Sequence, residues 1–154
     1  MKKLIPFLIS SVLVVGAVGC ETGAEKTSAD APNTTSETAE APTADEAQQT
    51  EDDATSELRR DQLNSDIRAR EERNNATGGD AIRADADLES EVRSKLEANL
   101  PASQLAVESE EGAVKVSGTV PTEEQLQRIE PLAKEIKGVK TVAVDATVAP
   151  AQPQ

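Results

Sequence analysis

Aliphatic residues recur at regular intervals only in the C-terminal half of the chain, from Ile82 to Val148. The first regular group has a spacing of four and consists of Leu88, Val92, Leu96 and Leu100. This spacing predicts a helix with one buried face, capped by Asp87 at its start and ended by Pro101.

Two alternating segments follow this helix. Apolar and polar residues alternate from Leu105 to Ser109, and a second alternating segment carries three valines, Val114, Val116 and Val120. The sequence Glu110-Glu111-Gly112 lies between the two segments and has the composition of a turn. The pattern therefore predicts a β-hairpin.

A second helix is predicted after the hairpin. Thr122 and Gln125 have the spacing of a capping box, and Gly138 lies where a left-handed C-terminal cap is expected. The buried face of this helix is formed by Leu126, Ile129, Ala133 and Ile136. Pro131 interrupts the helix at a cost of about 3 kcal/mol, so we expect a kink or a break near Glu130.

The last strand is predicted from four alternating small or aliphatic residues, Val142, Val144, Ala146 and Val148, and Pro150 ends it. The order is therefore helix, strand, strand, helix, strand. Since a strand–helix–strand connection crosses over right-handed, its two strands should be parallel. We expect an α+β domain over residues 81–150, with a three-stranded mixed sheet and both helices on one face.

The N-terminus has the features of an export signal. Lys2 and Lys3 precede an apolar stretch, residues 4–19, that is shorter than the roughly 20 residues of a membrane-spanning helix. Small residues lead into the single cysteine, Cys20, and this arrangement resembles a bacterial lipobox. The resemblance implies cleavage after residue 19, a diacylglycerol on the Cys20 thiol and anchoring by acyl chains without a span. The alternative is an ordinary secretory signal that leaves a free thiol.

Residues 20–55 are predicted to be a disordered acidic linker. From Glu21 to Thr55 the chain contains ten acidic residues, one lysine and no Val, Ile, Leu, Met or Phe. Such a composition buries too little apolar surface to offset the entropy of ordering. A flexible linker of this length has a root-mean-square reach of about 30–35 Å, enough to hold a domain away from an anionic surface.

Residues 56–80 are predicted to form a charged, partly helical segment. Ser56 is a possible helix cap, Leu63 and Ile67 lie four residues apart, and Gly78-Gly79 form a hinge. Five arginines alternate with six acidic residues, which favours a solvated helix. A docking helix for a partner protein is the alternative. Residues 151–154 are expected to be a disordered tail.

Composition and charge narrow the function. The chain has no His, Trp or Tyr, one aromatic residue (Phe7) and one cysteine (Cys20). Zinc sites and the usual nucleophile–base pairs need His or several cysteines, so we expect no catalytic site, no metal and no cofactor. The aspartates Asp80, Asp85 and Asp87 lack the spacing of a calcium loop. A net charge of −13 and the missing aromatic platform argue against nucleic-acid binding.

The predicted domain resembles the BON family. The resemblance is carried by Gly112-Ala113-Val114-Lys115-Val116-Ser117-Gly118-Thr119-Val120 in the hairpin and by Gly138-Val139 before the last strand. It covers about residues 82–149. The resemblance implies a non-catalytic module of the bacterial envelope, linked to osmotic shock and membrane integrity, that binds phospholipid or another envelope component. It assigns no polar site residue.

Four lysines are the candidate contacts for lipid headgroups: Lys115, Lys134, Lys137 and Lys140. The alternative role of these cations is to complement the C-terminal end of the second helix and to keep the domain soluble. We expect an envelope lipoprotein that binds phospholipid, with a protein-interaction module as the alternative. Glu21, the residue after the cysteine, favours the outer over the inner membrane.

Overall fold

The computed structural model of the chain describes residues 23–77 and 84–152. The predicted signal peptide, Cys20 and the Gly78-Gly79 hinge lie outside the described residues. In order, the elements are β1 (Glu25–Lys26), α1 (Ala44–Thr55), α2 (Glu57–Thr77), α3 (Asp85–Asn99), β2 (Gln104–Glu110), β3 (Ala113–Val120), α4 (Glu123–Lys134) and β4 (Thr141–Val148).

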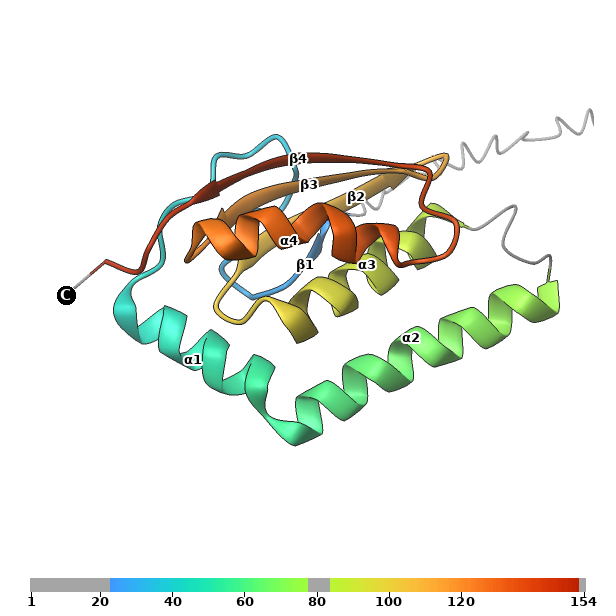
Figure 1. The fold of residues 1–154 in the computed structure, drawn as a ribbon, viewed down its shortest axis with the longest axis horizontal. Helices are drawn as coiled ribbons and strands as arrows, with labels where there is room; N and C mark the ends of the chain where they lie inside the picture. Colours follow the sequence, from blue (N-terminus) through green and yellow to red (C-terminus); the bar gives the residue numbers. More distant parts are fainter. Residues whose placement is uncertain (1–22, 78–83, 153–154) are drawn as a thin grey trace, which may run out of the picture.

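The sheet is mixed and has the strand order β1-β2-β3-β4. β2 and β3 pair antiparallel as a hairpin, and β3 and β4 pair parallel, so the predicted hairpin and crossover are confirmed. Helices α3 and α4 lie on one face of the sheet (Figure 1). The α+β class is confirmed, but the expected strand count of three is wrong because β1 adds a fourth strand antiparallel to β2.

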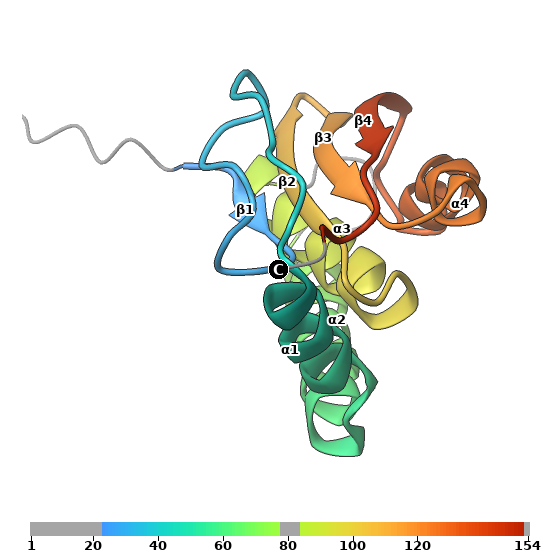
Figure 2. The same cartoon turned by 90° about the vertical axis from the view of Figure 1, so that its left-hand side faces the viewer.

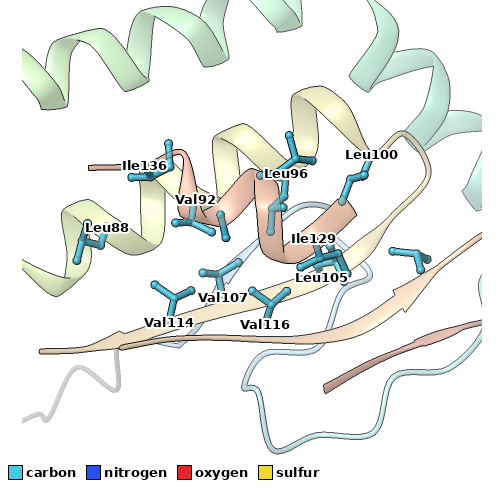
Figure 3. Close-up of a cluster of buried hydrophobic side chains, with 13 residues drawn as sticks. Leu88, Val92, Leu96, Leu100, Leu105, Val107, Val114, Val116, Ile129 and Ile136 are labelled. Carbon is cyan, nitrogen blue, oxygen red and sulfur yellow. The ribbon is translucent and has the colours of Figure 1, made fainter. Parts of the chain in front are cut away.

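The core lies between this face of the sheet and the two helices, and Figure 3 shows it in close-up. Alternate residues of β2 and β3 point towards α3 and α4, which contribute their apolar stripes. The core side chains are Leu88, Val92, Leu96, Leu100, Leu105, Val107, Val114, Val116, Val120, Ile129, Leu132, Ala133 and Ile136. The predicted spacings of four and two thus correspond to buried faces.

The hairpin depends on two glycines with left-handed backbone. Gly112 in the turn has φ 84°, and Gly118 in β3 has φ 128°. A Cβ at Gly118 would lie 2.0 Å from the backbone oxygen of Gln104 on β2. The close approach of β2 and β3 at this point therefore requires glycine.

The start of α3 differs from the expectation. The N-cap is Ala84, which offers no side-chain hydrogen bond, and the helix begins at Asp85. Asp87 is not the cap, because its carboxylate forms an ion pair with Arg70 of α2 at 3.0 Å. The residue that was expected to act locally instead joins two helices.

The second predicted helix, α4, begins as expected. The Thr122 hydroxyl accepts a hydrogen bond from the Gln125 N–H at 3.2 Å. Of the two expected outcomes near Glu130, a kink or a break, the break is absent, because α4 continues through Pro131 to Lys134. Pro131 lies in the last turn, where burial of neighbouring core residues offsets the lost hydrogen bond.

The connection after α4 is also different from the expected one. The helix ends before Ile136, which is nevertheless buried in the core. Gly138 has φ 95° and lies in the turn that leads to β4 rather than directly at the helix cap. Its left-handed conformation is confirmed.

The segment expected to be a structureless linker contains ordered elements within residues 23–55. Besides β1, it includes the helix α1, which begins with a capping box between Thr43 and Glu46. Between these elements the chain crosses the sheet on the face opposite α3 and α4 (Figure 2). There the Thr35 N–H donates to Glu108 Oε1 at 3.2 Å, and the Thr35 hydroxyl also bonds to Glu108.

Helix α2 is complete over 21 residues and packs against α3. The Ser56 hydroxyl accepts the Arg59 N–H at 3.2 Å, which confirms Ser56 as a cap. Leu63 is fully buried, whereas Leu58 is 82 % exposed. The expectation of a partly formed, solvated helix is therefore wrong for the face of α2 that carries Leu63.

The C-terminal residues are held as far as Gln152. The Ala44 N–H donates to the Gln152 oxygen at 3.0 Å, and the Gln152 N–H donates to the Pro42 oxygen at 2.9 Å. The expected disordered tail of residues 151–154 is thus paired at Gln152. Within residues 23–77 and 84–152, no helix is both long and apolar enough to cross a bilayer.

Candidate functional site

Three of the four candidate lysines lie together in sequence at the end of α4 and in the connection to β4. Lys134, Lys137 and Lys140 are all exposed. Lys134 Nζ lies 2.5 Å from Glu130 Oε1, and Lys140 Nζ donates to the Glu111 carbonyl oxygen at 2.7 Å. Both contacts are solvent-exposed, so a phosphate can compete for these ammonium groups at small cost.

Lys115 is separate from these three lysines. It lies on β3 between Val114 and Val116, whose side chains face the core, so Lys115 points to the opposite face of the sheet. It is half-buried, and its Nζ donates to the Thr35 oxygen at 3.1 Å. The N-terminal segment therefore covers Lys115, and the structure does not group it with the exposed lysines.

An acidic groove of about 870 Å³ lies at the hairpin end of the sheet. Its lining includes Glu89, Glu108, Glu110 and Glu111. Burial raises the pKa of the Glu89 carboxyl, the Ser109 N–H that it accepts opposes this rise, and repulsion by nearby carboxylates adds to it. Lys115 also lines this groove, but four carboxylates outnumber it, so the groove disfavours anions.

A network of ion pairs fixes the N-terminal segment to α3. Glu97 is almost fully buried and accepts from Arg59 of α2 at 2.6 Å and from Arg93 at 2.9 Å. Arg93 also lies 3.5 Å from Glu25 of β1. This network was not predictable from the sequence, because alternating Arg and Glu residues are typical of a solvated helix. Burial is predicted from apolar residues, whereas the buried residues of this network are charged.

The aspartates near the start of α3 have protein partners. One Asp85 oxygen accepts from the Ser109 hydroxyl at 3.2 Å and from the Gly112 N–H at 3.3 Å. Across the described parts of the chain, no group of His, Cys, Asp or Glu has the arrangement of a metal site. Asp85 therefore holds the hairpin turn against α3.

Comparison with known proteins gives the class of the folded domain. A model of the BON domain matches residues 84–150, from the N-cap of α3 to just beyond β4. Residues 84–150 are therefore similar to the BON domain, and residues 23–77 lie outside the match.

A particular relative is the osmotically-inducible protein Y of Escherichia coli (strain K12). It is 40 % identical over 63 residues, which are 40 % of this chain and 31 % of that protein. The chain thus covers less than a third of its relative. No solved structure matches the chain significantly.

Proposed function

We propose that the chain is a non-enzymatic lipoprotein of the bacterial envelope, whose BON domain binds the phospholipid surface and supports envelope integrity. The BON match and the similarity to an osmotically inducible protein support this setting. The lipobox-like sequence before Cys20 supports the anchor, and Glu21 favours the outer membrane.

The observation that carries the proposal is the exposed lysine segment. Lys134, Lys137 and Lys140 are exposed at the end of α4 and in the connection to β4, and Lys140 donates to the main-chain oxygen of Glu111, a residue that also lines the acidic groove. Each lysine near an anionic surface contributes about a fivefold gain in partition. Three such contacts give weak binding, which is sufficient for a domain that is already anchored to the same surface.

In the described fold, fewer residues lie between Cys20 and the folded domain than the expected linker of residues 20–55 would provide. Because Glu25 already pairs with Val107 of β2, only residues 21–24 separate Cys20 from the sheet. Five residue steps span at most about 18 Å. This is about half of the reach that was expected for a flexible linker, so the domain lies close to the membrane that holds its anchor.

Vesicle flotation of the chain from Glu21 to Gln154, which lacks the anchor, tests the proposal. We expect flotation with anionic vesicles at low salt, less at moderate salt, and none with zwitterionic vesicles. Replacing Lys134, Lys137 and Lys140 by Gln should reduce the bound fraction strongly.

A control with the same change in net charge replaces three exposed arginines of α2, Arg60, Arg68 and Arg73, by Gln. This control should float almost as well as the unaltered chain. Equal loss in both triple variants would show a general charge effect and contradict a lysine site. Absence of flotation with any vesicle would remove lipid binding as an activity of the domain.

The second candidate function is a protein-interaction module. The observation that favours it is the free edge of the sheet at β4, which is long and nearly uncharged. Helix α2 is a weaker candidate for docking, because its apolar residue Leu63 is already buried against the domain.

A further inference from the structure

The two edges of the sheet are very different. The β1 edge consists of two residues, and both are charged, Glu25 and Lys26. The β4 edge is eight residues long, from Thr141 to Val148. β4 is the last strand in the sheet order, so one side of its backbone has no strand partner among residues 23–77 and 84–152.

The direction of the free backbone groups follows from the ladder. The Ala149 N–H donates to the Val120 oxygen at 2.9 Å, so the odd-numbered residues of this strand direct their N–H and C=O groups towards β3. Successive residues of a strand alternate in direction. The outward groups therefore belong to the even-numbered residues of β4, which are Val142, Val144, Ala146 and Val148.

The same even-numbered residues expose apolar surface. Val144 and Val148 are 38 % and 37 % exposed, and they are two of the three large apolar side chains that are exposed among the described residues. Asp145 is the single charge in β4. Natural sheets protect free edges with lysines, prolines, bulges or short strands. β4 has none of these features along its length, so its edge is open to pairing.

We infer that the free edge of β4 binds an extended segment of another polypeptide as an added strand. Main-chain hydrogen bonds to the even-numbered residues would provide affinity, and side chains would provide specificity. The partner segment should place small or β-branched residues beside Val144 and Val148 and a basic residue beside Asp145. It alternates apolar and polar residues.

The position of α4 limits which kind of chain can pair with the free edge of β4. α4 packs against β4 and lies beside it on the core face of the sheet (Figure 2). A second copy that paired through its own β4 would bring its own α4 to the same place. The geometry therefore favours a segment without a helix on that face over a second copy.

The test uses the full-length chain in mild detergent and a labelled peptide, Thr-Val-Lys-Val-Thr-Val-Thr, with blocked ends. Fluorescence anisotropy measures binding, and hydrogen exchange measures protection of the β4 amides. We expect slower exchange at Val144, Ala146 and Val148. The odd-numbered amides, already bonded to β3, should change little.

Two perturbations separate the edge from other surfaces. Ala146→Pro removes an outward N–H that has no strand partner in the free protein, and proline is tolerated on such an edge. We expect binding to weaken at least tenfold. The second perturbation leaves the protein unaltered and N-methylates the peptide along one edge, so it remains informative if Ala146→Pro does not fold. We expect this peptide to bind at least tenfold more weakly.

Swapping the charges of Asp145 and of the peptide lysine tests whether these two groups interact. Asp145→Lys should weaken binding of the lysine peptide about fivefold and should restore binding of a peptide with Glu in place of Lys. Equal binding of the N-methylated peptide, protection outside β4, or no binding at peptide concentrations near 1 mM would overturn the proposal. A dimer of the unaltered chain that protects the same amides would show that the occupant is a second copy.

Discussion

Replacing Leu63 by Ala tests whether α2 belongs to the folded unit. Leu63 of α2 is fully buried, whereas Leu58 on the same helix is 82 % exposed, and α2 packs against α3. The substitution removes three carbon groups from a buried position and leaves a cavity. Leu→Ala changes in protein cores cost about 2–5 kcal/mol.

The expected loss lies in the lower half of this range, about 2–3 kcal/mol, since a seam between two helices closes more easily than a central core. In a chain of this size, 1 kcal/mol shifts the melting temperature by about 2–4 °C. Leu63→Ala should therefore melt about 5–10 °C lower. Leu58→Ala is the matched control and should remain within about 0.5 kcal/mol of the unaltered chain.

Far-UV circular dichroism in urea gives the free energy of unfolding, and limited trypsin digestion reports on α2, which carries Arg59, Arg60 and Arg68. If α2 separates from α3 before the domain unfolds, Leu63→Ala becomes sensitive to trypsin while the main transition changes little. Either a lower unfolding free energy or a higher sensitivity to trypsin for Leu63→Ala supports packing of α2 against α3. Equal urea midpoints and equal digestion rates for Leu63→Ala and Leu58→Ala would refute it.

Three further predictions concern single residues. Gly118→Ala should destabilise the domain by about 3 kcal/mol in urea unfolding, because its Cβ would collide with the backbone of Gln104; an unchanged midpoint would contradict this contact. Glu97→Ala should cost about 2–3 kcal/mol, below the 3–5 kcal/mol of a fully buried pair because Arg59 keeps some exposure; a loss below 0.5 kcal/mol, as is typical of surface sites, would show that the network is not buried. Because the pKa of Glu89 is raised in the folded protein, its carboxyl contributes most to folding stability when it is protonated. This contribution is lost as the pH rises from the ordinary pKa of glutamate through the raised pKa. The difference in unfolding free energy between Glu89→Gln and the unaltered chain should therefore be more favourable to the variant at pH 7 than at pH 4. The opposite trend would exclude a raised pKa.

The BON-like segment, residues 84–150, was largely predictable because its elements are amphipathic. The spacing of Leu88, Val92 and Leu96 specifies a helix with one buried face, and the alternation of Val114 and Val116 specifies a half-buried strand. Both patterns arise from the periodicity of side-chain direction. The break expected at Pro131 was wrong because a general cost was applied without knowing that the residue lies in the last helical turn.

The N-terminal segment was not predictable by the same means. β1 has no apolar pattern, since it is two charged residues that add backbone hydrogen bonds to β2. α2 is fixed by Leu63 and by the pair of Arg59 with Glu97, whose partners are 38 residues apart in the chain. Local sequence shows the charges but not their distant partners, so a buried network and a solvated helix look alike.

The candidate lipid contacts also show this limit. Sequence spacing identified four lysines near the second helix and the hairpin, but it could not show which face each one occupies. The sheet separates Lys115 from Lys134 because alternate residues of β3 point to opposite faces. Coverage of Lys115 by Thr35 depends on a segment 80 residues away in the chain.

The proposed anchor precedes β1 in the chain, and the candidate binding surfaces lie at or beside β4, at the other edge of the sheet, so the two proposals constrain each other. The chain enters at β1, and β4 with the lysine segment is three strands away, about 14 Å. With a tether of at most about 18 Å, the lysines come near the proposed anchoring membrane without full extension of the tether when the direction from β1 to β4 lies along the bilayer. When that direction is perpendicular to the bilayer, β4 faces away from the membrane and its edge is open to a partner. Lipid contact and strand docking thus favour different orientations, so anionic lipid should weaken binding of the strand peptide to the anchored protein.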